Sequence, residues 1–380
     1  MIALEISLWL LIATALYSVF GYPCLVILLG RAWKTGLVRE PIFPTVSIIV
    51  SAYNEEKAIA EKLDNTLALE YPRDRLEIIV ASDGSSDGTD AIVNRFHDRG
   101  VRLLRFDGGL GKTAVLNRAA TAASGEILVF SDATGMWDQK ALSAMMAHFA
   151  DPKVGCVSGR VGYSYDTSPT SSGFGWYQRY VLALRRSEAA FGSGFNASGS
   201  IHSIRKTAFL HGPADTFMDM VDPLHVAMQG LRTTFEENAV SMERSRTRTS
   251  EEFRARLRIA LRSWRFLAYA MPRLPVFRSP MYCFQVVSHK FLRWGIGPSL
   301  PLMLFLNLLL VGRGTIYAWL LGAQLSACGL TLLGLGLGRL GVRAPLLPAL
   351  VFFNTTNLAY LISLLRYARG ERAARWIPDR

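Results

Sequence analysis

The stretch Ile127–Gly135, ILVFSDATG, decides the fold of this chain. Five apolar or small residues lead directly to a carboxylate, Asp132, and leave no room for a helical period. Such a short apolar run is typical of a strand that is buried on both faces of a parallel sheet. We therefore predict a buried strand whose C-terminal end delivers Asp132 into the crevice where open α/β sheets bind their ligands.

Around this stretch, predicted strands alternate with predicted helices. The strands are Val46–Ala52, Leu76–Ser82, Val101–Phe106 and Ile127–Ser131, and the helices are Glu56–Leu69, Thr89–His97, Thr113–Ala123 and Gln139–Ala150. This alternation implies βαβ units, right-handed crossovers and a mainly parallel sheet, so the fold class is α/β. The strands are followed by the polar clusters YNEE, DGSSDGT, DGGLGKT and DATG, which we expect to form one binding face at the same edge of the sheet.

The regularity weakens after Asp151, although the α/β domain is predicted to extend over residues 44–240. Further strands are predicted at Val154–Gly159 and Ser198–Arg205, and further helices at Phe174–Ala190 and Asp222–Gln229. The four cysteines show no CxxC spacing and the six histidines never pair at helical spacing, which disfavours a zinc site and a disulfide framework.

The N-terminal flank of the domain is apolar. Residues 6–29 carry no charge and are long enough to span a bilayer core of about 30 Å, so we predict a retained transmembrane helix over residues 1–30. Arg31, Lys34 and Arg39 follow it directly, which predicts a cytoplasmic position for the domain.

The C-terminal flank is basic first and apolar afterwards. Residues 241–294 read as basic amphipathic or interfacial helices, residues 295–365 as three transmembrane segments (Gly295–Val311, Thr315–Leu337 and Pro345–Leu365), and residues 366–380 as a basic tail. Three crossings would place that tail outside, against the positive-inside rule, so either the tail is external or one segment is re-entrant. The net charge of +12 fits anionic lipid or phosphate-bearing ligands better than nucleic acid, because the basic residues lie beside apolar segments.

Three side chains at the predicted sheet edge suit a nucleotide diphosphate. Asp83 after the second strand can accept hydrogen bonds from a base, Asp132 can bind a ribose hydroxyl or a divalent cation, and Lys112 opens a helix where phosphate is stabilised. The GxxxxGK[ST] and GxGxxG spacings are absent, which disfavours a P-loop nucleotide site and an NAD-binding site. Taken singly, each residue is an ordinary turn former or N-cap; their joint placement favours a site.

The motifs VSIIVSAYNEE, IIVASDGSSDGT and GKTAVLNRAATAASGEILVFSDAT, in this order and spacing, resemble the nucleotide-sugar-binding half of family 2 glycosyltransferases, which have the GT-A fold. The later stretches DPKVGCVSG, GSIHSIRK and FMDMVDPLHVAMQGLRTTFEENA continue the match. The closing SHKFLRW and WIPDR look like the membrane-embedded branch that includes chitin-oligosaccharide and hyaluronan synthases. The resemblance covers about residues 44–265 strongly and the flanking helices loosely.

The resemblance implies a set of site residues. The nucleotide sugar would be bound by Ala52, Tyr53, Glu55, Asp83, Lys112, Ser131 and Asp132, the acceptor-side loop would hold Gly199, Ser200 and Arg205, and the general base would be Asp219. Asp132 would be the first acid of the DxD motif and would bind Mg²⁺ or Mn²⁺. Arg258, Arg262 and Trp264 are the nearest substitutes for the diphosphate or gating motif of processive synthases.

Three departures from the family pattern stand out. Thr134 replaces the second acid of DxD, which weakens the metal prediction. Met218 replaces the acid before the base, and Asp222 is a rival to Asp219 for that role. The Q(Q/R)xRW motif is absent, which leaves processive elongation open.

We therefore expect a multi-pass protein of the inner (plasma) membrane with its catalytic domain in the cytoplasm. It would transfer a sugar, with inversion, from a nucleotide-diphosphate donor, and the implied donor is UDP-linked. The acceptor would be a growing glycan or a lipid-linked saccharide, and membrane lipid would be a further partner. Two alternatives stay open: transfer of a single sugar to polyprenyl phosphate, and a catalytically silent nucleotide-binding partner of a polysaccharide synthase.

Overall fold

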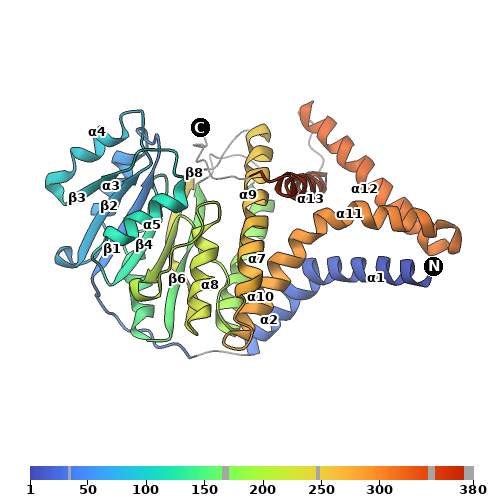
Figure 1. The fold of residues 1–380 in the computed structure, drawn as a ribbon, viewed down its shortest axis with the longest axis horizontal. Coiled ribbons are helices and arrows are strands. Elements are labelled where there is room, and N and C mark those ends of the chain that lie inside the picture. The colour runs from blue at the N-terminus through green and yellow to red at the C-terminus, as the bar shows by residue number, and fades with distance from the viewer. Residues whose placement is uncertain (33–35, 165–170, 245–248, 341–346, 372–380) are drawn as a thin grey trace. The chain divides into compact units, whose positions relative to one another are not determined.

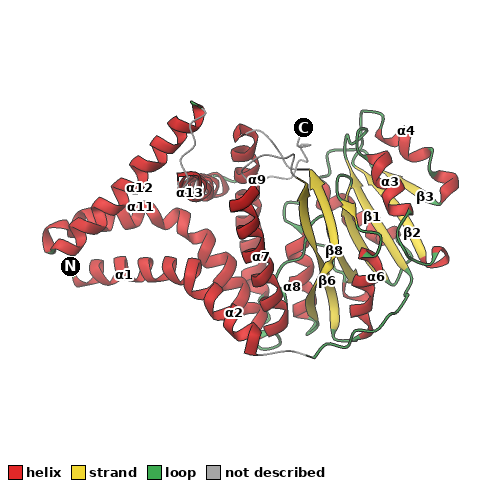
Figure 2. Ribbon diagram, turned by 180° about the vertical axis from the view of Figure 1, so that it is seen from behind, coloured by secondary structure: helices red, strands yellow, loops and turns green. Residues whose placement is uncertain are grey.

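The computed structural model describes residues 1–32, 36–164, 171–244, 249–340 and 347–371 (Figures 1 and 2). The chain forms two compact units. The α/β unit comprises Val26–Arg246 and Arg265–Gln285, and the helical unit comprises Met1–Leu25, Thr247–Trp264 and Val286–Arg372.

Half of the sheet in the α/β unit is parallel, as the strand–helix alternation predicts. Its strands are β1 (Val46–Ala52), β2 (Leu76–Ser82), β3 (Val101–Arg105) and β4 (Ile127–Asp132), in the spatial order β3-β2-β1-β4. The bounds of β1 and β2 agree with the prediction, and every residue of β1 is buried. Continuous apolar and β-branched runs of this kind are stable only where helices cover both faces.

Helices cover the two faces of these strands. They are α3 (Ile59–Leu67), α4 (Thr89–Asn94) and α5 (Lys112–Ala122), whereas α6 (Ala141–Met146) packs against the other half of the sheet. Along α3, Ile59, Leu63 and Leu67 recur every four residues and are buried in the cluster that contains Ile48 and Val50 of β1. The opposite face is covered by α5, whose Val115, Leu116 and Ala119 pack with Ile49 of β1 and Phe130 of β4.

The other half of the sheet is mixed. It contains β5 (Met136–Trp137), β6 (Val154–Ser164), β7 (Ile201–Arg205) and β8 (Arg232–Arg244), in the order β4-β7-β6-β8-β5. β7 runs antiparallel to β4, and β8 runs parallel to β6 with two irregularities in register. The helices α7 (Ser171–Phe191) and α8 (Met218–Met228) belong to this half. The sequence analysis did not predict β8.

The helical unit carries most of the apolar surface. Four helices are long and apolar enough to cross a membrane, judged by length and composition: Ile2–Ala32, Pro280–Arg313, Thr315–Gly338 and Leu347–Ala368. They contain α1 (Ile2–Leu16), α2 (Tyr22–Ala32), α10 (Pro280–Val286), α11 (Leu292–Leu310), α12 (Thr315–Arg339) and α13 (Leu347–Ala368). One N-terminal and three C-terminal helices of this kind agree with the expected number. In Figures 1 and 2, α1 and α11 lie side by side, and Leu8 packs against Met303 and Leu306.

The boundaries between the basic and apolar segments differ from those expected. The helix Pro280–Arg313 runs through residue 294 without a break, because a π-helical turn at Val287–Phe291 joins α10 to α11. The basic helix α9 (Thr249–Ala270) begins later than expected, because residues 241–244 belong to β8. Pro345, Arg246, Arg248 and the tail residues Arg372, Arg375 and Arg380 lie outside the described residues.

Short helical turns complete the described elements. They are Tyr17–Gly21, Arg73–Arg75, His97–Arg99, Ala147–Ala150, Lys206–Ala208, Met271–Arg273 and Val311–Arg313. The four cysteines are free thiols.

Candidate active site

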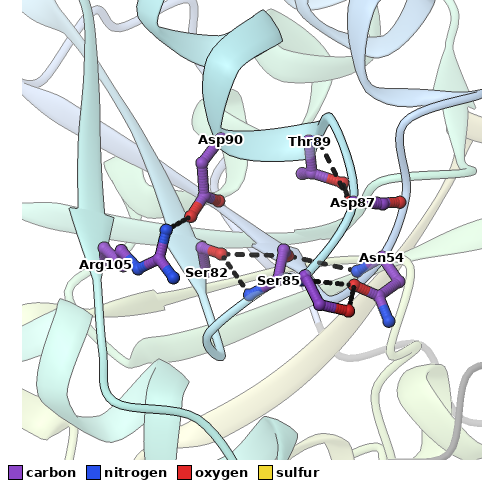
Figure 3. A network of polar contacts seen from close by, with 8 residues as sticks. Asn54, Ser82, Ser85, Asp87, Thr89, Asp90 and Arg105 are labelled. Atoms are coloured by element: carbon purple, nitrogen blue, oxygen red, sulfur yellow. Dashed lines mark hydrogen bonds and ion pairs between the residues drawn. The ribbon is translucent and has the colours of Figure 1, made fainter.

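The loops after β1 and β2 are joined by side-chain hydrogen bonds (Figure 3). The amide of Asn54 donates to Oγ of Ser85 at 3.1 Å, and the amide of Ser86 donates to Oδ1 of Asn54 at 2.8 Å. Asn54 adopts a left-handed backbone with φ of 55°, a conformation that asparagine tolerates better than most residues. The amide of Glu55 donates to Oγ1 of Thr89 at 2.8 Å. The predicted nucleotide-binding segment Ala52–Glu55 is therefore held against the DGSSDGT loop.

A second connection ties the helix after this loop to the sheet. Arg105 at the end of β3 forms an ion pair of 2.7 Å with Asp90 in the first turn of α4 (Figure 3). Asp87, which precedes the N-cap residue Gly88, stabilises the turn before the same helix, because its Oδ1 accepts a hydrogen bond of 3.0 Å from the amide of Thr89. The DGSSDGT cluster thus forms the turn and the helix start that its residues favour.

Asp83 shapes the loop that leads to Lys112. Its two carboxylate oxygens accept hydrogen bonds from the amides of Leu110 at 3.0 Å and Gly111 at 2.9 Å, and the residue is only 1% exposed. We expected this carboxylate to hold the base of the nucleotide. In this structure its hydrogen bonds go to the DGGLGK backbone, and its role toward a base stays a prediction.

The loops after β2 and β3 also touch through their backbones. A Cβ on Gly84 would lie 2.6 Å from Cα of Gly108, and Gly84 has a φ of 69°. Only glycine fits a position that combines a left-handed backbone with so close an approach. The two loops therefore depend on each other for their shape.

Lys112 and Asp132 meet at the carboxyl edge of the sheet. Lys112 is the first residue of α5, and its ammonium forms an ion pair with Oδ1 of Asp132 at the end of β4. Oγ of Ser51 donates to the same oxygen at 3.3 Å, and the hydroxyl of Ser131 donates to the carbonyl of Asp132 at 3.2 Å. Both charged side chains are about a quarter exposed, so a ligand can reach them.

Asp219 faces the same place from the other half of the sheet. It lies in the first turn of α8, which begins four residues before the helix that we predicted there, and its carbonyl accepts a hydrogen bond of 2.7 Å from Ala197. A Cβ on Gly199 would lie 3.8 Å from both Oδ2 of Asp219 and Nζ of Lys112. The ammonium of Lys112 and the carboxylate of Asp219 therefore both lie next to Gly199.

The rival carboxylate, Asp222, is in a different environment. It is 1% exposed, and its Oδ2 lies 3.1 Å from Nε2 of the equally buried His202. Because Nδ1 of His202 lies 2.8 Å from the carbonyl of Ser198 and must donate to it, a further proton must lie between Nε2 and Asp222. Burial raises the pKa of Asp222, although the hydrogen bond from His202 opposes that rise. This geometry favours Asp219 over Asp222 as the accessible base.

Ser200 supports the DATG turn, whereas Arg205 lies elsewhere. The carbonyl of Ser200 accepts a hydrogen bond of 3.1 Å from Nε1 of Trp137, and its hydroxyl donates to Glu243 of β8. Arg205 pairs with Ile127, the first residue of β4, and therefore lies at the sheet edge opposite Asp132. Its guanidinium donates to the carbonyls of residues 149, 151 and 154. The structure thus gives Arg205 a structural position and does not place it in the acceptor-side loop.

The expected gating residues lie in the helical unit, on α9. Trp264 is 8% exposed, and its Nε1 donates to Oγ of Ser363 at 3.1 Å and to the carbonyl of Tyr360 at 3.2 Å on α13. Arg256, eight residues earlier on the same helix, donates to Thr355 of α13 at 2.8 Å. Arg258 and Arg262 lie on the same helix, and the role of all three predicted residues toward a diphosphate stays a prediction.

The residues at the strand end do not fit a divalent cation by themselves. Within the described residues, no group of three His, Cys, Asp or Glu side chains is arranged to hold a metal ion. Asp132 is the one carboxylate of the DAT motif, and its Oδ1 is already paired with an ammonium. An ion here would therefore have one protein carboxylate, shared with Lys112, and would take its other ligands from the donor phosphates and water.

The sequence analysis missed Lys62. This residue of α3 is fully buried, and its ammonium donates to the carbonyl of Gly135 at 2.6 Å, in the turn that follows Asp132. A signal was available, because Lys62 lies between Ile59 and Leu63 on the apolar side of a predicted helix. Lysine is almost never fully buried without a specific reason.

Comparison with known proteins finds similarity to glycosyltransferases. Residues 47–211 match the model of Glycosyl transferase family 2. A probable glycosyltransferase, YdaM, of Bacillus subtilis is 34% identical over 123 residues, which are 31% of this chain and 29% of that protein. The poly-beta-1,6-N-acetyl-D-glucosamine synthase of Staphylococcus aureus strain COL is 28% identical over 206 residues, 51% of this chain and 48% of that protein. The chain thus spans about half, or less, of the length of these curated relatives.

A solved structure has the same fold over almost the whole chain. The mannosyltransferase PcManGT of Pyrobaculum calidifontis, solved with GDP-Man and Mn²⁺, has a TM-score of 0.70 at 23% identity, and the match covers 96% of this chain and 99% of that chain. This likeness confirms the predicted GT-A architecture with its flanking apolar helices, and those helices make the protein membrane-associated. Residues 47–211 are thus similar to family 2 glycosyltransferases, and the chain has the GT-A fold.

Proposed function

We propose that this protein is an inverting glycosyltransferase that moves a sugar from a nucleotide-diphosphate donor to a growing glycan or a lipid-linked saccharide. The observation that carries the proposal is that Lys112 is paired with Asp132 and lies, together with Asp219, next to Gly199. A cation, a carboxylate at a strand end and an accessible base are the groups that such a transfer needs at one place. The family 2 domain supports the same class of reaction.

Each group has a defined part in the transfer. A hydroxyl oxygen of the acceptor attacks the anomeric carbon of the donor sugar and gives its proton to the carboxylate of Asp219. The bond between the anomeric carbon and the diphosphate oxygen breaks, and the nucleoside diphosphate leaves with the bonding electron pair. Lys112 stabilises the charge that develops on this leaving group. Attack from the face opposite the diphosphate inverts the anomeric configuration.

The donor and acceptor follow from the relatives only as proposals. The Staphylococcus relative is by name a polysaccharide synthase, which supports a glycan acceptor and makes UDP-N-acetylglucosamine the first donor to test. The Pyrobaculum structure contains GDP-Man and Mn²⁺, so GDP-sugars and Mn²⁺ belong in the same test.

We place the protein in the plasma membrane with its α/β unit on the cytoplasmic side. Four helices are long and apolar enough to cross a bilayer. Arg31, Lys34 and Arg39 follow the first of them, and basic residues concentrate on the cytoplasmic side of transmembrane helices.

The decisive measurement is release of nucleoside diphosphate by the full-length protein in lipid nanodiscs. UDP-, GDP- and dTDP-sugars would each be supplied with Mg²⁺, with Mn²⁺ and with EDTA. We expect one donor to be turned over, and Asp219→Asn to abolish its turnover, whereas Asp98→Asn at a fully exposed carboxylate should change nothing. Donor binding without turnover under every condition, with a range of acceptors, would instead support a silent nucleotide-binding partner.

The length of the product distinguishes a polysaccharide synthase from an enzyme that transfers a single sugar to polyprenyl phosphate. A synthase would extend a lipid-free oligosaccharide primer, and an enzyme that transfers one sugar to polyprenyl phosphate would leave that primer unchanged. Mass spectrometry of the primer after incubation with the active donor decides between them.

A further inference from the structure

Lys62 places an unpaired positive charge inside the protein. The residue is 0% exposed, its Nζ donates to the carbonyl of Gly135 at 2.6 Å, and it lies 4.4 Å from the centre of the Trp137 ring. Among the described residues, no carboxylate lies within ion-pair distance of this ammonium. A carbonyl and the face of an indole ring are favourable partners for a cation, but they do not neutralise its charge.

Burying this charge is costly for the fold. Desolvation lowers the pKa of Lys62 from 10.5 to about 7, while the charge of Asp132 acts in the opposite direction. A methionine or leucine of similar length would fill the same space without that cost. A buried cation whose nearest influential charge is a site carboxylate is therefore a candidate for a role in the site.

Lys62 contacts the turn in which this chain departs from the DxD motif. Gly135 ends the turn that begins at Asp132, because its amide donates to the carbonyl of Asp132 at 3.3 Å. Thr134, in the middle of this turn, stands where the family resemblance has its second carboxylate. The turn thus has one negative charge fewer than the DxD pattern, and one buried positive charge beneath it.

The formal charges of the groups at this turn show the electrostatic effect of having Thr134 in place of the second acid. Two carboxylates and one divalent cation sum to zero before the donor arrives. Here Asp132 contributes one negative charge, while Lys112 and protonated Lys62 contribute two positive charges, so these three groups around the DATG turn sum to +1 without any ion, and Asp219 beside Gly199 adds one negative charge to the wider site. A diphosphate is attracted by a positive site whether a metal ion or fixed ammonium groups supply the charge.

We infer that Lys62 acts as a fixed cation beneath the DATG turn and, together with Lys112, allows the donor diphosphate to bind without a divalent cation. The inference rests on the proposed function, since it concerns the same donor site. Lys62 is a positioning residue in this role: it is too deeply buried to touch the donor, and it acts through its charge and through the turn that it holds.

Binding of UDP and GDP by isothermal titration calorimetry tests the inference. The full-length protein in nanodiscs would be titrated in EDTA and in Mn²⁺ at pH 6, where Lys62, with a pKa of about 7, is protonated. For the nucleotide that binds, we expect the Kd in EDTA to stay within about threefold of the Kd in Mn²⁺. Lys62→Met should weaken binding in EDTA tenfold or more and should weaken it less in Mn²⁺. The control is Lys57→Met, an exposed lysine five residues earlier, which should change neither value.

A second variant keeps the test independent of the folding of Lys62→Met. Thr134→Asp restores the second carboxylate of the turn, so we expect weaker binding in EDTA and a new dependence on Mn²⁺. Binding by the unaltered protein that is lost in EDTA and restored by Mn²⁺ would overturn the inference while leaving the proposed function intact. Binding of neither nucleotide under either condition would overturn both.

Discussion

The α/β unit and the helical unit place their polar groups in opposite ways. In the α/β unit the apolar side chains are hidden between sheet and helices, and the charged groups of the site lie at the edge of the sheet. In the helical unit large apolar side chains face outward, with Trp319 78% and Leu332 70% exposed. Its polar side chains pair between helices instead, as Thr331 does with Asn354 at 2.6 Å.

This difference indicates which solvent surrounds each unit. Outward apolar side chains and inward hydrogen bonds are stable when lipid surrounds the helices, because lipid offers no hydrogen bonds. Inward apolar side chains and outward charges suit water. Lys62 departs from this pattern in the α/β unit, because its ammonium is fully buried.

The largest effect should follow from removing the base of the α/β unit. Asp219→Asn should lower turnover by about 10²-fold or more while the Kd for the nucleotide stays unchanged, since a general base contributes to the transition state and not to donor binding. Steady-state kinetics and calorimetry on the same sample would check this. Full activity in Asp219→Asn together with loss in Asp222→Asn would show that the buried carboxylate is the base.

A charge on the outward face of the helical unit should be the next most harmful change. Leu332→Arg places a guanidinium on α12 where 70% of the side chain is exposed, and arginine at the centre of a membrane helix costs about 2.5–3.5 kcal/mol. We expect a marked loss of membrane-inserted protein, measured by resistance to alkaline extraction. Leu210→Arg, at a 45% exposed leucine of the α/β unit, is the matched control and should be tolerated. Equal tolerance of both would mean that the two units share the same solvent.

The buried ammonium of Lys62 predicts that the free energy of unfolding depends on pH. The pKa of Lys62 is lowered to about 7 in the folded protein from 10.5, so below pH 7 the lysine is charged in both states and the full cost of burial applies. Between pH 7 and 10.5 the unfolded chain binds a proton that the folded protein lacks, and stability therefore rises with pH. The advantage of Lys62→Met in the free energy of unfolding should be largest below pH 7 and shrink by a few kcal/mol toward pH 10. Parallel pH profiles of the two proteins would contradict this placement of Lys62.

The smallest expected effect concerns one hydrogen bond between membrane helices. Thr331→Val removes the hydroxyl that accepts from Asn354, and such bonds contribute about 0.6 kcal/mol on average. Thermal unfolding in nanodiscs should show a slight loss of stability. The control is Thr356→Val, because Oγ1 of Thr356 is buried without a hydrogen-bond partner and its removal should be neutral or stabilising.

The parallel half of the sheet could be predicted from the sequence, and the mixed half only in part. β1 and β2 are unbroken apolar runs followed by turn residues, so local sequence and tertiary burial agree. β8, by contrast, reads RTTFEENAVSMER, and nothing local identifies it as a strand. The buried carboxylate of Glu236 in this strand is stabilised by a partner from elsewhere in the fold, His148 at 2.8 Å.

The same distinction applies to the site. Asp132 and Lys112 could be proposed from the sequence because one ends a strand and the other begins a helix, where ligands of α/β sheets bind, whereas Asp219 was implied only by the family resemblance. The structural position of Arg205 could not, because its distance from Asp132 follows from the antiparallel register of β7. Lys62 could not be assigned to the site either, because a lysine on a helix is ordinarily solvated and its contact with Gly135 spans 73 positions in the chain.

The contact between Gly84 and Gly108 has a consequence for anyone who wishes to redesign the donor preference of this protein. The loops after β2 and β3 share a backbone contact and the carboxylate of Asp83, so neither can be exchanged alone without disturbing its neighbour. A chimera that exchanges residues 83–111 as one segment keeps both glycines and the hydrogen bonds of the Asp83 carboxylate together. Libraries that vary only one of the two loops would mostly sample misfolded sites.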